Sequence, residues 1–229
     1  MSWITNFLTS SLGKKLIMSL TGLFLIVFLV VHLAGNLQLL YDDNGVAFNT
    51  YAHFMGENEL IQFLSFGLYA FILLHIIQGL VIWVLNRRAR GVGYAVSNRK
   101  SNSFASRQMA LLGLLIFFFL AVHMGDFWYK VKFTDQLTMV PIEGLDGELV
   151  KDLYARVNAA FSEWWIVVIY LLGLLALSLH LWHGFQSAFQ TLGLNHKKYT
   201  PVIKTLGRLY AVLIPLGFAT IPLYFYFIK

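Results

Sequence analysis

The chain lacks cysteine and has few charged residues for its length. Without cysteine it cannot form disulfides, zinc–thiolate sites, cysteine-ligated iron–sulfur clusters or the thioether links of c-type haem. Charged residues make up 12% of the 229 residues, against about 25% in soluble domains. Hydrophobic residues make up 58%, and the mean hydropathy is +0.68. These values exclude an ordinary soluble domain and predict a membrane protein, in which histidine, methionine or carboxylate would have to hold any redox metal.

Long apolar runs take the place of the missing charge. A helix needs about 20 apolar residues to cross roughly 30 Å of hydrocarbon, and five segments of this chain qualify. We therefore predict one all-α membrane domain over residues 1–229, a bundle of five transmembrane helices with short interfacial helices at 2–12, 46–55 and 148–161. Residues 89–103 have the composition of a linker. The predicted spans are residues 15–40, 60–86, 107–129, 163–190 and 205–228.

The charged residues are divided between the two ends of these spans. Twelve of the 17 basic residues precede the first span or fill the loops between spans two and three and between spans four and five. All 11 acidic residues lie at the opposite ends. The positive-inside rule then places the N-terminus in the cytoplasm. The net charge of +6 is thus a topology signal rather than a sign of nucleic-acid binding, and it leaves a cationic cytoplasmic face for a protein partner.

Four histidines lie deep inside four different apolar segments: His32, His75, His123 and His180. An ionisable residue in hydrocarbon is costly, so each is a candidate functional residue. At a rise of 1.5 Å per residue, His32 and His123 lie about 24–26 Å from the basic ends of their helices. His75 and His180 lie about the same distance from the acidic ends of theirs. The sequence therefore predicts an outer layer of His32 with His123 and an inner layer of His75 with His180.

Each layer takes one histidine from each of two helices, and such a pair can clamp a flat haem macrocycle from both sides. Two stacked haems would conduct electrons across the membrane. A single buried histidine is more often a hydrogen-bonded packing residue, but four at matched depths favour ligation. His183, three residues after His180, is an alternative fourth ligand, because depth alone does not separate the two.

Several motifs distributed over nearly the whole chain accompany these histidines. They are His-Leu-Ala-Gly-Asn at 32–36, Ala-Phe-Asn-Thr-Tyr-Ala-His-Phe-Met at 47–55, His75 with Gly79, His123, and His-Leu-Trp-His-Gly at 180–184. With them the chain resembles the dihaem cytochrome b membrane anchor of succinate:quinone oxidoreductases (succinate dehydrogenase or fumarate reductase), of the five-helix, single-subunit type. The motif at 47–55 is the most specific. The family's pattern of a ligand histidine with glycine four residues later matches His180 and Gly184.

The resemblance implies a set of cofactors and partners. One haem b would be held by His75 and His180 near the cytoplasmic side, and a second by His32 and His123 near the outer side. An FAD-containing flavoprotein and an iron–sulfur subunit would dock on the cytoplasmic face, and electrons would reach a membrane quinone, more often menaquinone in this type. The chain would be a multi-pass subunit of the bacterial cytoplasmic membrane, and the resemblance admits a higher oligomer of the complex.

Other residues are weaker candidates. His53, Glu57 and Glu59 lie at the outer interface, where they could serve quinone binding or proton transfer, although each alone is more often a solvated loop residue. Ser19 and Arg107, near the inner ends of their spans, are candidate partners of haem propionates. Some members of the family have a carboxylate two residues before the fourth ligand, proposed for proton movement. This chain has Ser178 there, which puts that route in doubt.

Three alternatives remain on sequence grounds. A cytochrome b anchor of another respiratory dehydrogenase, such as a hydrogenase or formate dehydrogenase, would share the haems but differ in the electron donor, and the motif at 47–55 argues against it. A transporter with a histidine proton relay would be expected to have carboxylates at mid-membrane, and the sequence places none there. A diiron membrane oxygenase would need clustered histidines near one membrane face, whereas these are spread singly over the spans.

Overall fold

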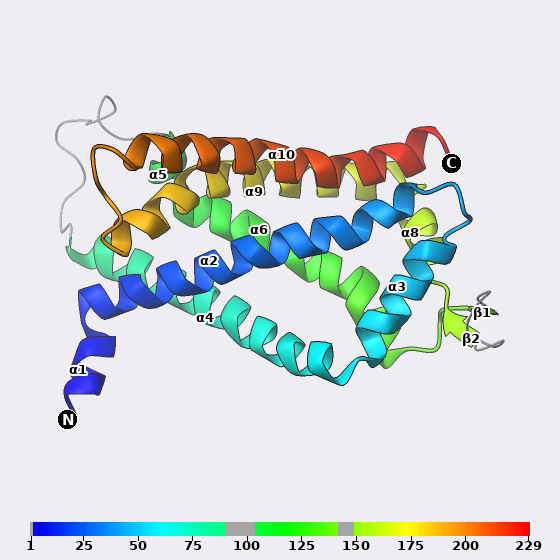
Figure 1. Cartoon of the computed structure of the whole chain (residues 1–229), viewed down its shortest axis with the longest axis horizontal. Coiled ribbons are helices and arrows are strands. Elements are labelled where there is room, and N and C mark those ends of the chain that lie inside the picture. Colours follow the sequence, from blue (N-terminus) through cyan, green and yellow to red (C-terminus); the bar gives the residue numbers. More distant parts are fainter. Residues whose placement is uncertain (1, 90–103, 142–148) are drawn as a thin grey trace.

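The computed structural model describes residues 2–89, 104–141 and 149–229, and helices dominate them. Five helices are long and apolar enough to cross a membrane, which confirms the predicted all-α membrane bundle (Figure 1). Each lies close to its predicted bounds, although most of the predicted linker 89–103 lies outside the described residues. The five are Ser11–Leu40, Glu59–Ala89, Met109–Phe133, Trp164–Thr191 and Thr200–Phe227.

Two of these spans are composite. The first consists of a long α-helix and a final 3-10 turn, and the third contains a π-helical turn, η2, directly after His123. The helices of the described residues are α1 (Trp3–Thr9), α2 (Ser11–Asn36), η1 (Leu37–Leu40), α3 (Val46–Glu57), α4 (Glu59–Ala89), α5 (Phe104–Arg107), α6 (Met109–His123), η2 (Met124–Tyr129), α7 (Lys130–Phe133), α8 (Leu153–Phe161), α9 (Trp164–Thr191) and α10 (Thr200–Phe227). The strands are β1 (Met139–Pro141) and β2 (Leu149–Lys151).

The N-terminal interfacial helix is shorter than predicted. It ends at Thr9, because the hydroxyl of Ser10 accepts a hydrogen bond from the backbone N–H of Gly13 and so caps a new helix, α2. At Gly13 a Cβ would lie 2.1 Å from the carbonyl oxygen of Phe7. Glycine is therefore required where α1 turns away from α2, and the predicted helix 2–12 is two elements (Figure 1).

The prediction of one helix over 148–161 is wrong at its start. Residues 149–151 form β2, which pairs antiparallel with β1 and brings Val140 opposite the buried Val150. Helix α8 begins only after Asp152, whose side chain accepts from the backbone N–H of Ala155 at 3.0 Å. A buried apolar residue such as Val150 between more exposed neighbours is compatible with a short strand or with one turn of helix. Here the pairing with β1 makes the segment a strand. The helix predicted at 46–55 is found as α3.

Four of the long helices pack as a ring, in which α2 and α6 each contact both α4 and α9. The fifth, α10, packs outside this ring against α9 and α2 (Figure 1). The two members of each diagonal, α2 with α6 and α4 with α9, thus face one another across the interior. At the end of the bundle that carries α3 and α8, an apolar core closes the ring. It contains Leu39, Phe48, Val157, Ala160, Phe161, Ile166, Val167, Tyr170, Ile221 and Phe225.

Glycine sets the closest approach between α6 and α9. A Cβ built on Gly173 would lie 2.5 Å from two ring carbons of Phe119. Phe119 cannot simply swing away, because its ring also packs edge-on against Tyr170, with centroids 5.1 Å apart. Gly113, in the second turn of α6, has no such neighbour within 4 Å of its Cβ position.

These two glycines make a matched test of the packing. Gly173→Ala should lower the free energy of unfolding in detergent, because the overpacking cost of about 1–3 kcal/mol exceeds the helix-propensity gain of up to about 1 kcal/mol. Gly113→Ala should be neutral or slightly stabilising, because only the propensity term acts there. Denaturant titration of both variants in the same micelle checks the difference in sign. Equal effects would contradict the described α6–α9 packing.

Candidate functional site

The four mid-membrane histidines meet in two pairs across the interior of the helix ring. His32 on α2 and His123 on α6 have ring centroids 5.8 Å apart. His75 on α4 and His180 on α9 have ring centroids 6.2 Å apart. Each pair joins the two helices of one diagonal of the ring. The structure thus brings together the same partners that the depth arithmetic pairs in the sequence.

Both separations match what two axial ligands of one metal ion require. A histidine nitrogen binds a metal at about 2.0 Å, and the ring centroid lies about 1.1 Å farther along that line, so two trans imidazoles have centroids about 6 Å apart. The rings are inclined to one another by 84° in the outer pair and by 67° in the inner pair. Such angles are compatible with axial ligation, because each ring can rotate about its own metal–nitrogen bond.

In the inner pair, His75 is braced by α2. Its Nδ1 lies 3.1 Å from the hydroxyl oxygen of Thr21, and that hydroxyl donates to the carbonyl of Ile17 at 2.8 Å. The Thr21 oxygen is therefore the acceptor for an Nδ1–H of His75, which leaves Nε2 with the lone pair that a metal needs. At Gly22 a Cβ would lie 3.2 Å from Cε1 of His75, so glycine makes room for the ring.

The partner ring of the inner pair has an orphaned nitrogen. Nδ1 of His180 is buried and has no hydrogen-bond partner among the described residues. A buried polar atom without a partner is costly, and such sites are often functional. The orphaned nitrogen, the cradle at Gly22 and the ring separation all fit a ligand held between His75 and His180.

The outer pair is surrounded by aromatic rings. Phe28 stacks on His32 at a centroid distance of 5.2 Å, and Phe218 of α10 lies 5.5 Å from the same ring. Phe119 and Phe127 flank His123 at 6.0 and 5.5 Å. These apolar neighbours fit the faces of a flat apolar macrocycle better than a hydrated ion.

The two histidines of the outer pair differ in their hydrogen-bond partners. Nδ1 of His123 lies 3.3 Å from the hydroxyl of Tyr170 on α9. Beside His32, the amide nitrogen of Asn36 donates to the His32 carbonyl at 2.8 Å and lies 3.2 Å from its Nδ1. Because that amide nitrogen can only donate, Nδ1 of His32 accepts, and the ring hydrogen is on Nε2. Metal binding through Nε2 of His32 would therefore require the hydrogen to move to Nδ1 and the Asn36 amide to turn.

His183, the alternative fourth ligand, is half-buried on α9. The ring that packs against His75 is that of His180, and His180 is the residue with the buried orphaned nitrogen. The geometry thus favours His180 over His183 as the partner of His75. Ser178, two residues earlier, donates its hydroxyl to the carbonyl of Ala211 at 2.7 Å and so ties α9 to α10.

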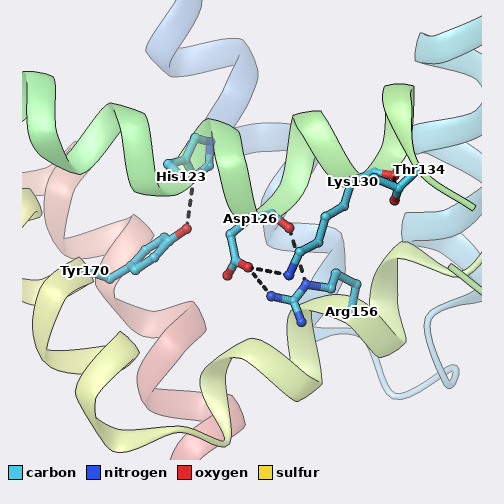
Figure 2. A network of polar contacts seen from close by, with 6 residues as sticks. All are labelled: His123, Asp126, Lys130, Thr134, Arg156 and Tyr170. Atoms are coloured by element: carbon cyan, nitrogen blue, oxygen red, sulfur yellow. Dashed lines mark hydrogen bonds and ion pairs between the residues drawn. The ribbon is translucent and has the colours of Figure 1, made fainter. Parts of the chain in front are cut away.

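A charged network lies next to the outer pair, beyond His123 (Figure 2). Asp126 of η2 accepts from Lys130 at 3.0 Å and from the guanidinium of Arg156 on α8, and its side chain is 14% exposed. The Nε of Arg156 also donates to the Asp126 carbonyl at 3.3 Å. The network pins the π-turn that follows His123 to α8. π-turns are frequent at functional sites.

Two of the three candidates for quinone binding or proton transfer lie together. His53 and Glu57 line an open groove of about 840 Å³ between α3 and the end of the first span. Glu59 is not one of the groove's lining residues and begins α4. Tyr51 also lines the groove and packs against α2, where a Cβ at Gly35 would lie 2.4 Å from its ring. Burial raises the pKa of Tyr51, so its phenol is protonated at neutral pH and can donate a hydrogen bond. The remaining lining residues are Gln38, Ala47, Thr50, Phe54 and Asn58.

The two candidate partners of haem propionates, Ser19 and Arg107, lie in different environments. Ser19 is buried, and its hydroxyl donates to the Lys15 carbonyl of its own helix at 2.9 Å. Arg107 is exposed at the end of α5. Ser19 would have to exchange its intrahelical bond before it could bind another group.

Sequence reasoning missed the residues that hold the histidine rings. Thr21 and Tyr170 are ordinary polar residues of apolar helices, and only the packing of α4 on α2 and of α6 on α9 brings them to a ring nitrogen. The contact of Asn36 with His32 could have been predicted, because Asn36 lies four residues after His32, one turn along the same face of the helix. The sequence places Asp126 only among the acidic residues at the outer ends of the spans, and it gives no sign of the pairing of Asp126 with Arg156.

Among residues 2–89, 104–141 and 149–229, no three histidine, aspartate or glutamate side chains gather in the manner of a multi-ligand ion site. The buried histidines occur in pairs, which is the arrangement of axial ligands. Comparison with family models, curated proteins and solved structures gives no match. The functional interpretation therefore rests on the residues and their geometry.

The Asp126 network predicts a difference between two ion pairs of the chain. Asp126→Asn should lower the free energy of unfolding in detergent by about 1–3 kcal/mol, because it leaves Arg156 and Lys130 without their partly buried counter-charge. The matched variant Asp42→Asn should have no measurable effect, because Asp42 is 95% exposed in its 3.4 Å pair with Lys229. Denaturant titrations measure both. A neutral Asp126→Asn would contradict a supporting role for the network.

Proposed function

We propose that the chain is the cytochrome b membrane anchor of a succinate:quinone oxidoreductase, the family that its motifs resemble. The observation that carries the proposal is the two histidine pairs, each formed across the bundle and each at the separation of two axial ligands. His75 and His180 would hold one haem b, and His32 and His123 the second. When bound, haem iron supplies one-electron oxidation and reduction.

The chain's own residues would bind the cofactors and control their surroundings. Because two imidazoles would be available to hold each haem, the bound haems would favour electron transfer over oxygen binding. Thr21 would keep the Nε2 lone pair of His75 available, and the phenylalanines around the outer pair would exclude water. The sequence has no dinucleotide-binding or cluster motif, so dicarboxylate chemistry would belong to other subunits.

The two ends of the bundle would face different compartments. The C-terminal end of α4, α5 and the α9–α10 connection lie with α1 at one end, and α3, α8 and the strands lie at the other (Figure 1). Basic residues predominate at the first end, so we infer that it faces the cytoplasm of a bacterium and carries the N-terminus. A flavoprotein and an iron–sulfur subunit would dock there through complementary charge.

The groove between α3 and the first span is the candidate quinone site. It lies toward the acidic end of the bundle, and it combines an apolar wall with Tyr51, His53 and Glu57. Reduction of a quinone, which we propose is menaquinone, consumes protons as well as electrons. His53 and Glu57 are ionisable groups that could relay those protons from the outer solution.

Selective loss of haem tests the proposed ligands. The wild-type chain should purify with two haems b, seen in reduced-minus-oxidised spectra and by haem extraction. His123→Ala should remove only the outer haem, and His180→Ala only the inner one, because each variant breaks one pair. Each variant should therefore retain one haem, and the midpoint potential of the haem left in His123→Ala should differ from that of the haem left in His180→Ala.

His183→Ala is the matched control for the fourth ligand. It lies one turn from His180 on α9 and should retain both haems. A colourless wild-type preparation from haem-replete cells would contradict the proposed function. Loss of the inner haem in His183→Ala, with its retention in His180→Ala, would instead show that the ligand was assigned to the wrong histidine.

The groove predicts a difference between two nearby carboxylates. Glu57→Gln should reduce the rate of quinone reduction by the assembled complex about tenfold or more, because it removes a proton-transfer group from the groove. Glu59→Gln should leave the rate unchanged, because Glu59 does not line the groove. Steady-state assays with a water-soluble quinone, at matched haem content, measure both. Equal rates in the two variants would move the quinone site elsewhere.

A further inference from the structure

Tyr170 lies between the outer histidine pair and a charged network (Figure 2). The side chain is buried on α9, and its hydroxyl lies 3.3 Å from Nδ1 of His123. A histidine that binds a metal through Nε2 has its hydrogen on Nδ1 and usually donates it to a nearby oxygen, which fixes the ring and makes it a stronger ligand. The phenol oxygen of Tyr170 is placed to accept that hydrogen.

A carboxylate, that of Asp126, lies on the other side of Tyr170 from His123 (Figure 2) and acts on it through its charge. Oδ1 of Asp126 is engaged by Lys130 and Arg156, but Oδ2 is buried and has no partner among the described residues. Figure 2 shows the Asp126 carboxylate lying between its cations and the Tyr170 side of the site. The charges of Asp126 and Arg156 also act on Tyr170 electrostatically.

The inner pair has a different support. There the acceptor for His75 is the Thr21 hydroxyl, whose own hydrogen goes to the Ile17 carbonyl of α2. That arrangement is neutral and ends within one helix. In the outer pair the ring nitrogen meets a phenol, and that phenol lies near the charged pair of Asp126 and Arg156, which joins η2 to α8.

We propose that Tyr170 is the positioning residue of the outer histidine pair. It accepts the Nδ1 hydrogen of His123 close to the negative charge of Asp126, so that His123 presents Nε2 and gains basicity from the phenol oxygen and from that charge. This inference rests on the proposed function, because it concerns the iron that His123 would bind. A more basic axial ligand stabilises oxidised iron, so Tyr170 holds the reduction potential of the outer haem down.

The test is a reductive titration of the purified chain with both haems bound, followed by optical and electron paramagnetic resonance spectra. In Tyr170→Phe the ring volume is kept and only the hydroxyl is lost. The outer haem should become about threefold to tenfold easier to reduce, which is a rise of about 28–59 mV at 59 mV per tenfold for one electron. Its low-spin resonance should shift, and the inner haem should keep its potential and its resonance.

Tyr210→Phe is the matched control. It removes another phenol hydrogen bond between helices, from Tyr210 to the carbonyl of Ile26 at 2.5 Å. It should leave both potentials unchanged, whereas a merely structural role for Tyr170 would make the two variants alike. If Tyr170→Phe loses the outer haem, Asp126→Asn provides the same measurement, with a smaller shift of the outer haem in the same direction.

The outcomes separate the two proposals. A wild-type chain without two haems would overturn the proposed function. Two haems with an unchanged outer potential in Tyr170→Phe, or in Asp126→Asn where that variant provides the measurement, would overturn the role of Tyr170 alone. Equal shifts of both haems would also overturn it, because the hydrogen bond of Tyr170 reaches only His123.

Discussion

An imidazole ring in the interior of a membrane protein must have its two nitrogens satisfied, and the structure is arranged around four such rings. The four imidazoles come from α2, α4, α6 and α9, which pack in a circle. They meet in two pairs across that circle, with ring centroids 5.8 and 6.2 Å apart. Without a ligand, four polar rings inside a hydrophobic bundle would lower its stability. With an axial metal between the members of each pair, the same rings would connect α2 to α6 and α4 to α9.

The two pairs share one geometry but differ in their environment. The inner pair is supported by Thr21 and Gly22 of α2, which accept and accommodate the ring of His75. The outer pair lies among phenylalanines, with the Tyr170 hydroxyl at His123 and the charges of Asp126 and Arg156 nearby. Because hydrogen bonding and charge near an axial ligand tune a haem's potential, identical ligand sets can give two different potentials in one chain. That difference would make electron flow directional.

Much of this arrangement could be predicted from the sequence. Hydropathy identified the five spans, because about 20 apolar residues in a row leave few other structures. The fixed rise of a helix then turned the positions of His32 and His123 into a shared depth, and those of His75 and His180 into another.

Features that depend on which helices pack together could not be predicted from the sequence in this way. Thr21 and Tyr170 acquire their roles only because α2 packs on α4 and α9 packs on α6. The π-turn after His123 is held by Asp126 and Arg156, which lie 30 residues apart in the sequence, and the strand at 149–151 is decided by its pairing with β1 rather than by its own pattern.

The central claim is that each histidine pair holds one iron atom between two imidazoles. Electron paramagnetic resonance of the oxidised, purified chain tests it most directly, because it distinguishes iron with two strong axial ligands from iron with an open position. The account predicts two low-spin ferric signals of equal intensity, one from each pair. A spectrum dominated by high-spin iron, or one without a haem signal in a chain purified from haem-replete cells, would contradict it.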